Sequence, residues 1–278
     1  MAATSVTPGL AGLVVNGMLL GAAALTVAPL VWMLSVSLMS PGEASTFPPP
    51  LVPGQPTLAN YRELFTHAGM GRYLVNSVVL TVAVTLVSLL FNVAAGYAFA
   101  KLPFTGRDRI FKSLLAALVI PGQVAMVPLF LLLKQLGLVN TYGGVIVPAM
   151  ASIFGMFVVR QYALSIPDEI LEAARIDGAN EFRIFRSVIV PVLKPIIVTL
   201  AVFTSLGTWN DFMWPLIVLN DSDLYTLPVA LASLSREHVQ DNELMMAGAV
   251  LTTLPVLAVF LVLQRHYVEG LMLGSIKG

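Results

Sequence analysis

The sequence predicts an all-α integral membrane protein with six transmembrane helices, and two observations carry this prediction. Hydrophobic residues make up 57% of the 278 residues and charged residues only 11%, whereas about a quarter of the residues in a soluble domain are charged. The apolar residues come in blocks, and a helix of about 20 such residues crosses a hydrocarbon core of about 30 Å. We expect one transmembrane domain over residues 1–278, with spans at 12–38, 73–100, 111–133, 142–162, 194–219 and 244–265.

The individual spans carry further signals. No basic residue precedes the first apolar block, and the block is too long for a typical signal peptide, so we expect a retained helix; a cleaved signal is the alternative. A proline-rich loop at 39–71 should form a stiff exposed connection, and an acidic loop is expected at 221–243. Kinks are expected at the prolines inside the later spans, which are Pro121, Pro128, Pro148, Pro215 and Pro255.

The lysines and arginines predict the orientation, because short positively charged loops stay on the cytoplasmic side. With a cytoplasmic N-terminus, eleven basic residues lie inside and four outside, so both termini should be cytoplasmic. The four outside are Arg62, Arg72, Lys134 and Arg236.

A charged island interrupts the apolar sequence at residues 167–191, PDEILEAARIDGANEFRIFRSVIVP. Pro167 suits the start of a helix, and Asp168 and Glu169 complement the positive end of the helix dipole. Gly178 permits the positive φ that ends a helix. We therefore predict a short amphipathic helix in the loop 167–186, with a second segment at 180–189 leading into the fifth span.

The island resembles the EAA loop of permease subunits of ABC importers, E-A-A-x3-G-x9-I-x-L-P. Glu172, Ala173, Ala174, Gly178 and Pro191 match at every spacing, with valine in place of the motif's isoleucine and leucine. AGYAFA at 95–100, WND at 209–211, WPL at 214–216 and the tail from 269 to 278 are similar to the carbohydrate branch of this family. The likeness covers nearly the whole chain and is strongest to the shorter permease subunit of maltose-type transporters.

This resemblance implies a type I ABC importer permease fold in a bacterial inner membrane, with the EAA loop as a coupling helix on a cytoplasmic ATPase. Glu172, Ala173, Ala174, Asp177, Gly178 and Pro191 would form the coupling surface. The implied partners are a second homologous permease, two ATPase subunits and an extracytoplasmic solute-binding protein; a different chain is favoured as the second permease. A solvated loop helix with self-paired charges is the alternative for 167–186.

The sequence itself contains no means of hydrolysing ATP, because no G-x-x-x-x-G-K-[ST] run occurs. ATP and magnesium should therefore be bound by the partner ATPase, and no cofactor or metal site is expected in this chain. The chain has no cysteine, which excludes thiol catalysis, and we find no other catalytic motif. It is expected to be a non-catalytic subunit.

A single acid, Asp211, lies inside the fifth span, where a charge costs about 2.5–3.5 kcal/mol on insertion scales. With Trp209, Asn210 and Trp214 it could line a sugar path by aromatic stacking and hydrogen bonding. Equally, Asp211 could pair with a base or cap a broken helix, and the tryptophans could be packing residues. For the other polar positions in spans, Asn76, Asn92 and Gln123, we expect hydrogen bonds between helices.

The predicted function is therefore half of the translocation path of an ATP-driven importer, with a di- or oligosaccharide as the expected substrate. Monosaccharides and polyol phosphates stay open. The alternative function is an ion-coupled secondary transporter that uses Asp211, which would have no need of an E-A-A-x3-G helix.

Overall fold

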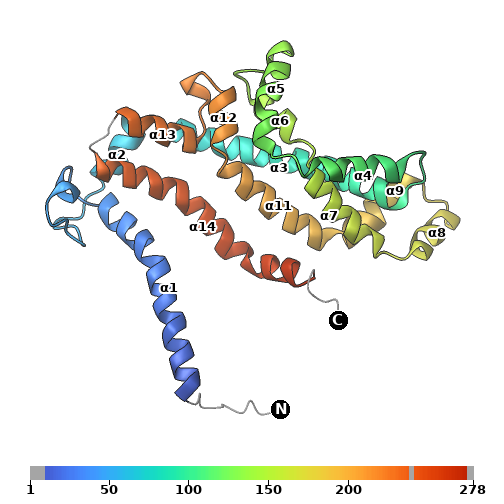
Figure 1. The fold of residues 1–278 in the computed structure, drawn as a ribbon, viewed down its shortest axis with the longest axis horizontal. Helices are drawn as coiled ribbons and strands as arrows, with labels where there is room; N and C mark the ends of the chain where they lie inside the picture. Colours follow the sequence, from blue (N-terminus) through green and yellow to red (C-terminus); the bar gives the residue numbers. More distant parts are fainter. Residues whose placement is uncertain (1–9, 238–240, 274–278) are drawn as a thin grey trace. The chain divides into compact units, whose positions relative to one another are not determined.

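The computed structural model describes residues 10–237 and 241–273, and every regular element in these ranges is a helix. The chain divides into two compact units. One comprises Met1–Gly69 and Leu231–Thr253, and the other comprises Met70–Ala230 and Leu254–Gly278. The helices α13 (Leu227–Glu237) and α14 (Asn242–Leu273) each contribute to both units (Figure 1).

The first unit contains α1 (Leu10–Ser37), a 3-10 turn η1 (Glu43–Ser45) and α2 (Ala59–Thr66). Most of α1 is exposed, as expected for a lipid-facing helix. The proline-rich connection is more ordered than a linker, because Asn60 of α2 is buried and its Nδ2 donates to the carbonyls of Ser37, at 3.0 Å, and Met39, at 2.8 Å.

The expectation of an acidic loop over 221–243 was wrong for about half of its length, because residues 227–237 form α13. Leu227, Ala230 and Leu234 are at most 6% exposed, and their spacing of three and four places them on one face of a helix. This short apolar pattern lies between acids that we took as the sign of a loop. Glu243, at the end of the range, is fully buried, and its Oε1 accepts a hydrogen bond of 2.7 Å from Ala44 N.

The second unit is built around α3 (Met70–Lys101), which packs against α7 (Ile153–Leu164) and α11 (Lys194–Trp209) (Figure 1). Two glycines permit the close approach of α3 and α7. A Cβ on Gly96 would lie 2.5 Å from Val159 Cγ1, and a Cβ on Gly155 would lie 2.6 Å from Asn92 Nδ2. Small residues allow such tight crossings where lipid gives helices no hydrophobic drive to associate.

Three of the expected spans are interrupted by residues outside the helices, and one of these interruptions is a sharp bend. The third consists of α4 (Arg107–Ala117) and α5 (Gly122–Gln135), which are bent by 106°. Pro121 lies at the break, where it lacks the N–H needed to continue the helix. The fourth consists of α6 (Tyr142–Ala149) and α7, and the fifth of α11 and α12 (Met213–Val218), with residues 210–212 outside both helices.

The span count depends on two sharp bends, of which the one between α4 and α5 is the first. Four helical stretches of the described chain are long and apolar enough to cross a membrane: Gly12–Ser37, Met70–Lys101, Tyr142–Leu164 and Asn242–Leu261. Six result if each bent pair counts as one span. The second bent pair joins Glu181–Val192 to Lys194–Trp209 at 76°, between Pro191 and Pro195.

Candidate functional site

The charged loop contains the short helix predicted from its sequence, α8 (Asp168–Ile176). Pro167 precedes it with φ −58° and ψ 137°, and Asp168 and Glu169 occupy its first turn. Both carboxylates complement the partial positive charge of the helix N-terminus.

Gly178 ends α8 in a Schellman motif. Its φ is +78°, its N–H donates to Arg175 O at 3.0 Å, and Ala179 N–H donates to Ala174 O at 3.0 Å. Asn180 then caps α9 (Glu181–Ile184) by accepting from Arg183 N at 2.8 Å. The chain continues through a π-helical turn, η2 (Phe185–Ile189), and α10 (Val190–Val192), which contains Pro191.

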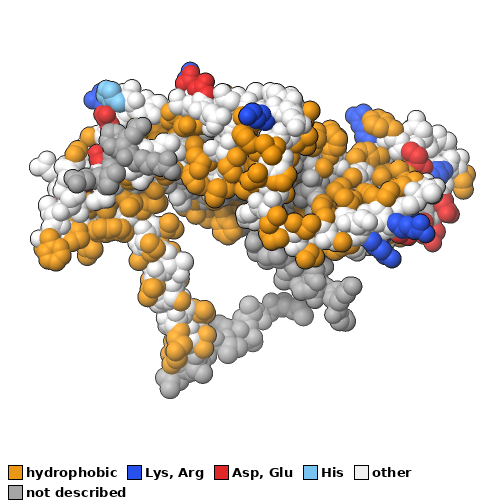
Figure 2. Space-filling view, turned by 45° about the horizontal axis from the view of Figure 1, so that its top comes forward, with side chains coloured by type: hydrophobic (Ala, Val, Ile, Leu, Met, Phe, Trp, Pro, Cys, Tyr) orange, Lys and Arg blue, Asp and Glu red, His pale blue; other side chains and the backbone are white. Residues whose placement is uncertain are grey.

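The two sides of α8 differ in exposure. Leu171 is 2% exposed and belongs to a core cluster with Tyr97 of α3 and Ile184 of α9, and Ala174 packs against this cluster. The opposite side is exposed and holds Glu169, Glu172, Ala173 and Ile176, of which Ile176 is 86% exposed. Figure 2 shows charged side chains gathered at the end of the second unit that carries α8 and α9. The loop therefore presents one mixed acidic and apolar face that its own subunit does not cover.

Two polar anchors fasten the inner side of α8 to α3. Lys101 is 6% exposed at its side chain, and its Nζ donates to Ile166 O at 2.6 Å and to Asp168 Oδ1 at 2.5 Å. This bond to Lys101 is the main reason why the pKa of Asp168 is lowered.

The second anchor passes through Glu181. Its Oε1 accepts from Arg175 Nε at 2.9 Å, and its Oε2 accepts from Tyr97 OH at 3.0 Å. Arg175 thus bonds Glu181, although Glu172 lies three residues away on the same helix. The Glu172 carboxylate lies on the exposed side.

The break in the fifth span holds the predicted path residues. Asp211 Oδ1 accepts from Trp214 N at 3.3 Å, which is the helix-capping arrangement left open as an alternative. Asn210 is exposed, and its Nδ2 donates to Leu206 O at 2.8 Å. Trp214 is 8% exposed, and its Nε1 donates to Gly144 O at 3.1 Å.

Trp209 is 7% exposed and lines a cavity of about 210 Å³ in the second unit. The cavity lies between α3, α11 and α14, and its wall includes Thr81, Ser205 and Pro255. The break therefore combines packed aromatic rings with a few polar groups. Whether these residues contact a substrate stays a prediction.

A comparison with protein families gives the family of this chain. Residues 92–272 match the family described as "Binding-protein-dependent transport system inner membrane component". The chain belongs to this family. It is therefore an inner-membrane permease component and not an enzyme, and its relatives are named as permease proteins.

Two relatives and one solved structure illustrate how similar this permease is to known proteins. It is 39% identical over 245 residues to the arabinooligosaccharides transport system permease protein AraQ of Halalkalibacterium halodurans, covering 88% of this chain and 86% of AraQ. It is 34% identical to the lactose transport system permease protein LacG of Rhizobium radiobacter, covering 92% and 93%. A chain of a bacterial ABC transporter involved in the import of the acidic polysaccharide alginate superposes with TM-score 0.82 and 24% identity, covering 95% of the permease and all of that chain. This likeness confirms the expected fold.

The predicted coupling residues of the permease differ in their exposure to solvent. Glu172, Ala173, Asp177 and Gly178 are exposed, whereas Ala174 packs against the permease's own core. Ala174 is therefore less available to a partner than Ala173, and the coupling role of these residues stays a prediction. Pro191 is exposed in α10, beyond the π-helical turn. Residues 274–278 of the tail lie outside the described residues.

Sequence reasoning missed the role of Tyr97 and Lys101 as anchors of the loop. Tyr97 was noted only as part of the family-like segment at 95–100, and Lys101 only as one of the eleven basic residues expected on the cytoplasmic side. The available signal was their spacing of four, which places two polar groups on one side of a helix at its end. A buried lysine at that end requires an oxygen partner, and Asp168 starts the next charged segment.

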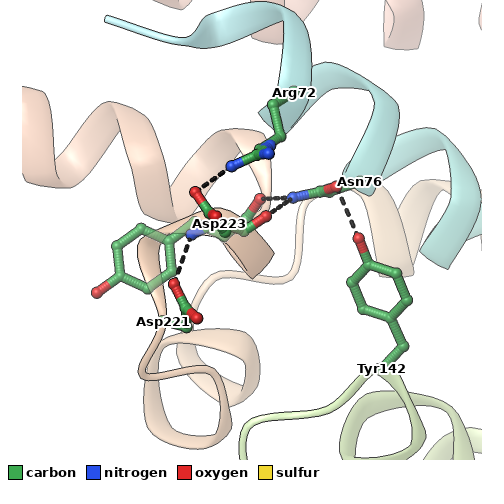
Figure 3. Close-up of polar contacts among 6 residues, drawn as sticks. Arg72, Asn76, Tyr142, Asp221 and Asp223 are labelled. Carbon is green, nitrogen blue, oxygen red and sulfur yellow. Dashed lines mark hydrogen bonds and ion pairs between the residues drawn. The ribbon is translucent and has the colours of Figure 1, made fainter.

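The expected hydrogen bonds between helices are confirmed for Asn92 and Asn76 of the permease. Asn92 Oδ1 accepts from Ser152 N at 2.9 Å, ahead of α7. Asn76 Nδ2 donates to Asp223 O at 2.9 Å and Tyr225 O at 3.0 Å, and its Oδ1 accepts from Tyr142 OH at 2.7 Å (Figure 3). Gln123 is exposed in α5, and the prediction for it stays open.

Proposed function

We propose that this permease forms half of the translocation path of an ATP-driven importer for a di- or oligosaccharide. The observation that carries the proposal is α8, a capped helix with E-A-A-x3-G-x9 spacing and one uncovered face, in a family that depends on binding proteins. The names of two relatives, which mention arabinooligosaccharides and lactose, support a sugar substrate. Energy comes from a partner, because the sequence has no P-loop.

The assembly that fits this role contains two cytoplasmic ATPase subunits, which hold ATP and magnesium. A second homologous permease completes the path, and an extracytoplasmic binding protein delivers the sugar. The bias of eleven basic residues against four supports cytoplasmic termini and a cytoplasmic α8 in a bacterial inner membrane.

The exposed side of α8 suits a socket on the ATPase. Ile176 supplies an apolar contact, Ala173 lets a groove wall come close, and Glu172 is available to a basic residue of the partner. Asp177 and Gly178 form the corner that follows the helix. Closure of the ATPase dimer would then displace α8 as a unit and with it the helices to which α8 is fastened.

For the sugar path we keep Trp209, Asn210, Asp211 and Trp214 as candidates. The exposed Asn210 at the break of the fifth span offers an amide to sugar hydroxyls. Both tryptophans are at most 8% exposed, and Trp209 lines the cavity between α3, α11 and α14. Asp211 would keep its capping bond to Trp214 N and contribute its second oxygen.

The test is ATP hydrolysis and sugar uptake by the full assembly in lipid vesicles, with binding protein and a panel of sugars. One sugar should stimulate hydrolysis in the wild type. The double variant Glu172→Lys with Gly178→Asp should lose both stimulation and uptake while the membrane core still assembles. Lys112→Glu, a charge reversal at an exposed position of α4, is the matched control and should retain both activities.

Uptake at the wild-type rate by the double variant would contradict the proposed coupling surface. Uptake that survives ATP depletion but stops when the ion gradient is dissipated would instead favour the secondary transporter and Asp211.

A further inference from the structure

The inner side of α8 is fastened to α3 at both of its ends. Asp168, in the first turn, bonds Lys101, and Arg175, in the last turn, is held through Glu181 by Tyr97. Leu171 lies between them and is 2% exposed. Residues 168, 171 and 175 are spaced by three and four, so they share one side of the helix. The contacts to α3 therefore involve the side of α8 that carries the buried Leu171, with the exposed Asp168 and Arg175 at its edge.

Lys101 makes this attachment stiff because it bonds on both sides of Pro167. Its ammonium contacts the carbonyl of Ile166, at the end of α7, and the carboxylate of Asp168, at the start of α8. The lysine side chain is 6% exposed, so water competes little for its bond to Ile166 O, whereas the side chain of Asp168 is 73% exposed and its bond is partly open to water. We call Tyr97 and Lys101, with their partners Ile166, Asp168 and Glu181, the inner joint.

The other end of α3 carries a second polar attachment. Arg72 pairs with Asp223, and Asn76 donates to the carbonyls of Asp223 and Tyr225 (Figure 3). The Asn76 amide oxygen also accepts from Tyr142 OH at the start of α6. We call Arg72 and Asn76, with these three partners, the outer joint.

The outer joint bonds the segment of chain that follows the break in the fifth span. Residues 219–226 come directly after α12, and Asn140 holds their start by accepting from Asn220 N and Asp221 N at 2.9 Å and 2.8 Å. Leu227 N donates to Ser77 Oγ at 2.7 Å, which adds a further bond from α3 to the end of this segment.

Between the joints, α3 is built to stay straight. Its 32 residues contain no proline, and at about 1.5 Å per residue it is roughly 48 Å long. It packs against α7 and α11, with Gly96 in tight contact with Val159. A helix supported in this way moves as one body rather than bending.

We infer that α3 is a strut that carries the displacement of α8 across the membrane to residues 219–226. This inference rests on the proposed function, because it assumes that the ATPase displaces α8. Tyr97, Lys101 and Asn76 are then positioning residues for transport. They contact neither nucleotide nor the proposed sugar path, yet they determine whether hydrolysis produces movement at the break of the fifth span.

The test compares sugar transported per ATP hydrolysed, in the full assembly in vesicles, for one variant at each joint. Lys101→Gln keeps a donor for Ile166 O but loses the charged bond to Asp168. Asn76→Asp keeps the acceptor for Tyr142 OH but loses both bonds to carbonyls. Each should lower the transport-to-hydrolysis ratio roughly tenfold, as expected when one or two strong hydrogen bonds are removed, with hydrolysis kept within about twofold.

The combined variant distinguishes a strut from two independent structural contacts. Effects at sites more than about 10 Å apart usually add in free energy, so independent contacts predict roughly a hundredfold loss. A strut fails once either joint fails, so the double variant should lose no more than the worse single variant. Lys112→Gln and Tyr142→Phe are the controls: the first should leave the ratio unchanged, and the second should lower it less than Asn76→Asp.

Three results would overturn the strut. They are an unchanged ratio in both single variants, an equal fall of transport and hydrolysis in an intact assembly, and additive losses in the double variant. These results are distinguishable from a failure of the proposed function. If the α8 variant Glu172→Lys with Gly178→Asp is inactive while Lys101→Gln transports normally, only the strut is wrong.

Discussion

Replacing Gly96 by alanine tests the crossing of α3 and α7 most directly. The added Cβ would lie 2.5 Å from Val159 Cγ1, 2.6 Å from Val159 Cβ and 3.1 Å from the backbone N of Arg160. Because carbon atoms prefer separations of about 3.5–4.0 Å, the helices must move apart by roughly 1 Å. Overpacking of this kind costs about 1–3 kcal/mol, against a gain of about 1 kcal/mol in helix propensity. We expect a net loss of up to about 2 kcal/mol.

The assay is thermal unfolding of the purified permease in detergent, with Gly207→Ala as the matched control. Gly207 lies in α11, and a Cβ there would meet nothing within 4 Å, so this variant should be neutral or slightly stabilising. Gly96→Ala should lower the unfolding midpoint by a few degrees, about 2–4 °C for each kcal/mol in a chain of this size. Adding Val159→Ala should restore little of the loss, because Val159 Cβ itself is too close. A midpoint for Gly96→Ala equal to that of Gly207→Ala would refute the close crossing.

Three further outcomes are expected. Trp214→Phe leaves Gly144 O without its indole donor and should lower the free energy of unfolding by about 1–3 kcal/mol, measured as a lower unfolding midpoint. An unchanged midpoint would mean that another donor bonds this carbonyl. Gly178→Ala has room for its methyl group but must adopt φ near +78°, which costs about 1–2 kcal/mol. Asparagine tolerates this conformation better, so Gly178→Asn should retain more sugar-stimulated ATP hydrolysis than Gly178→Ala. Equal losses of hydrolysis in the two variants would contradict the backbone explanation. Because its lowered pKa reflects the bond to Lys101, Asp168 should stabilise the fold above its ordinary pKa of 3.8 and lose this contribution as pH falls through the folded value. The stability of Asp168→Asn should therefore fall less with pH in that range, and parallel curves would contradict the pairing.

The sequence predicted those parts of the fold that depend on local chemistry. Pro167, the two acids after it and Gly178 determine α8, because helix starts and ends depend on a few adjacent residues. The apolar blocks predicted the long helices for a similar reason. The position of Asn76 in a span also predicted a hydrogen bond to another segment, because an amide in an apolar span needs a partner.

Features that depend on distant parts of the chain could not be predicted in this way. Pro121 indicates that the helix is interrupted before α5. The angle of 106° between α4 and α5, however, depends on how each of these helices packs. Arg175 could have paired with Glu172 on its own helix; only the return of the chain through Asn180 brings Glu181 within 2.9 Å. The burial of Ala174 likewise depends on which side of α8 meets α3.

The EAA pattern has nine residues between its glycine and its next aliphatic residue, here residues 179–187. The π-helical turn at Phe185–Ile189 offers a physical reason why this number is fixed. Ile184, Ile189 and Leu193 are all fully buried, although in a regular α-helix the first two would point about 140° apart. The turn, closed by Val190 N–H on Phe185 O, adds one residue and brings Ile189 back to the core side. The number of residues in this stretch therefore matters more than their identity. Valines stand at 188 and 190 where the EAA pattern has isoleucine and leucine, and they keep an aliphatic side chain there, whereas a single deletion or insertion would rotate the whole fifth span relative to α8.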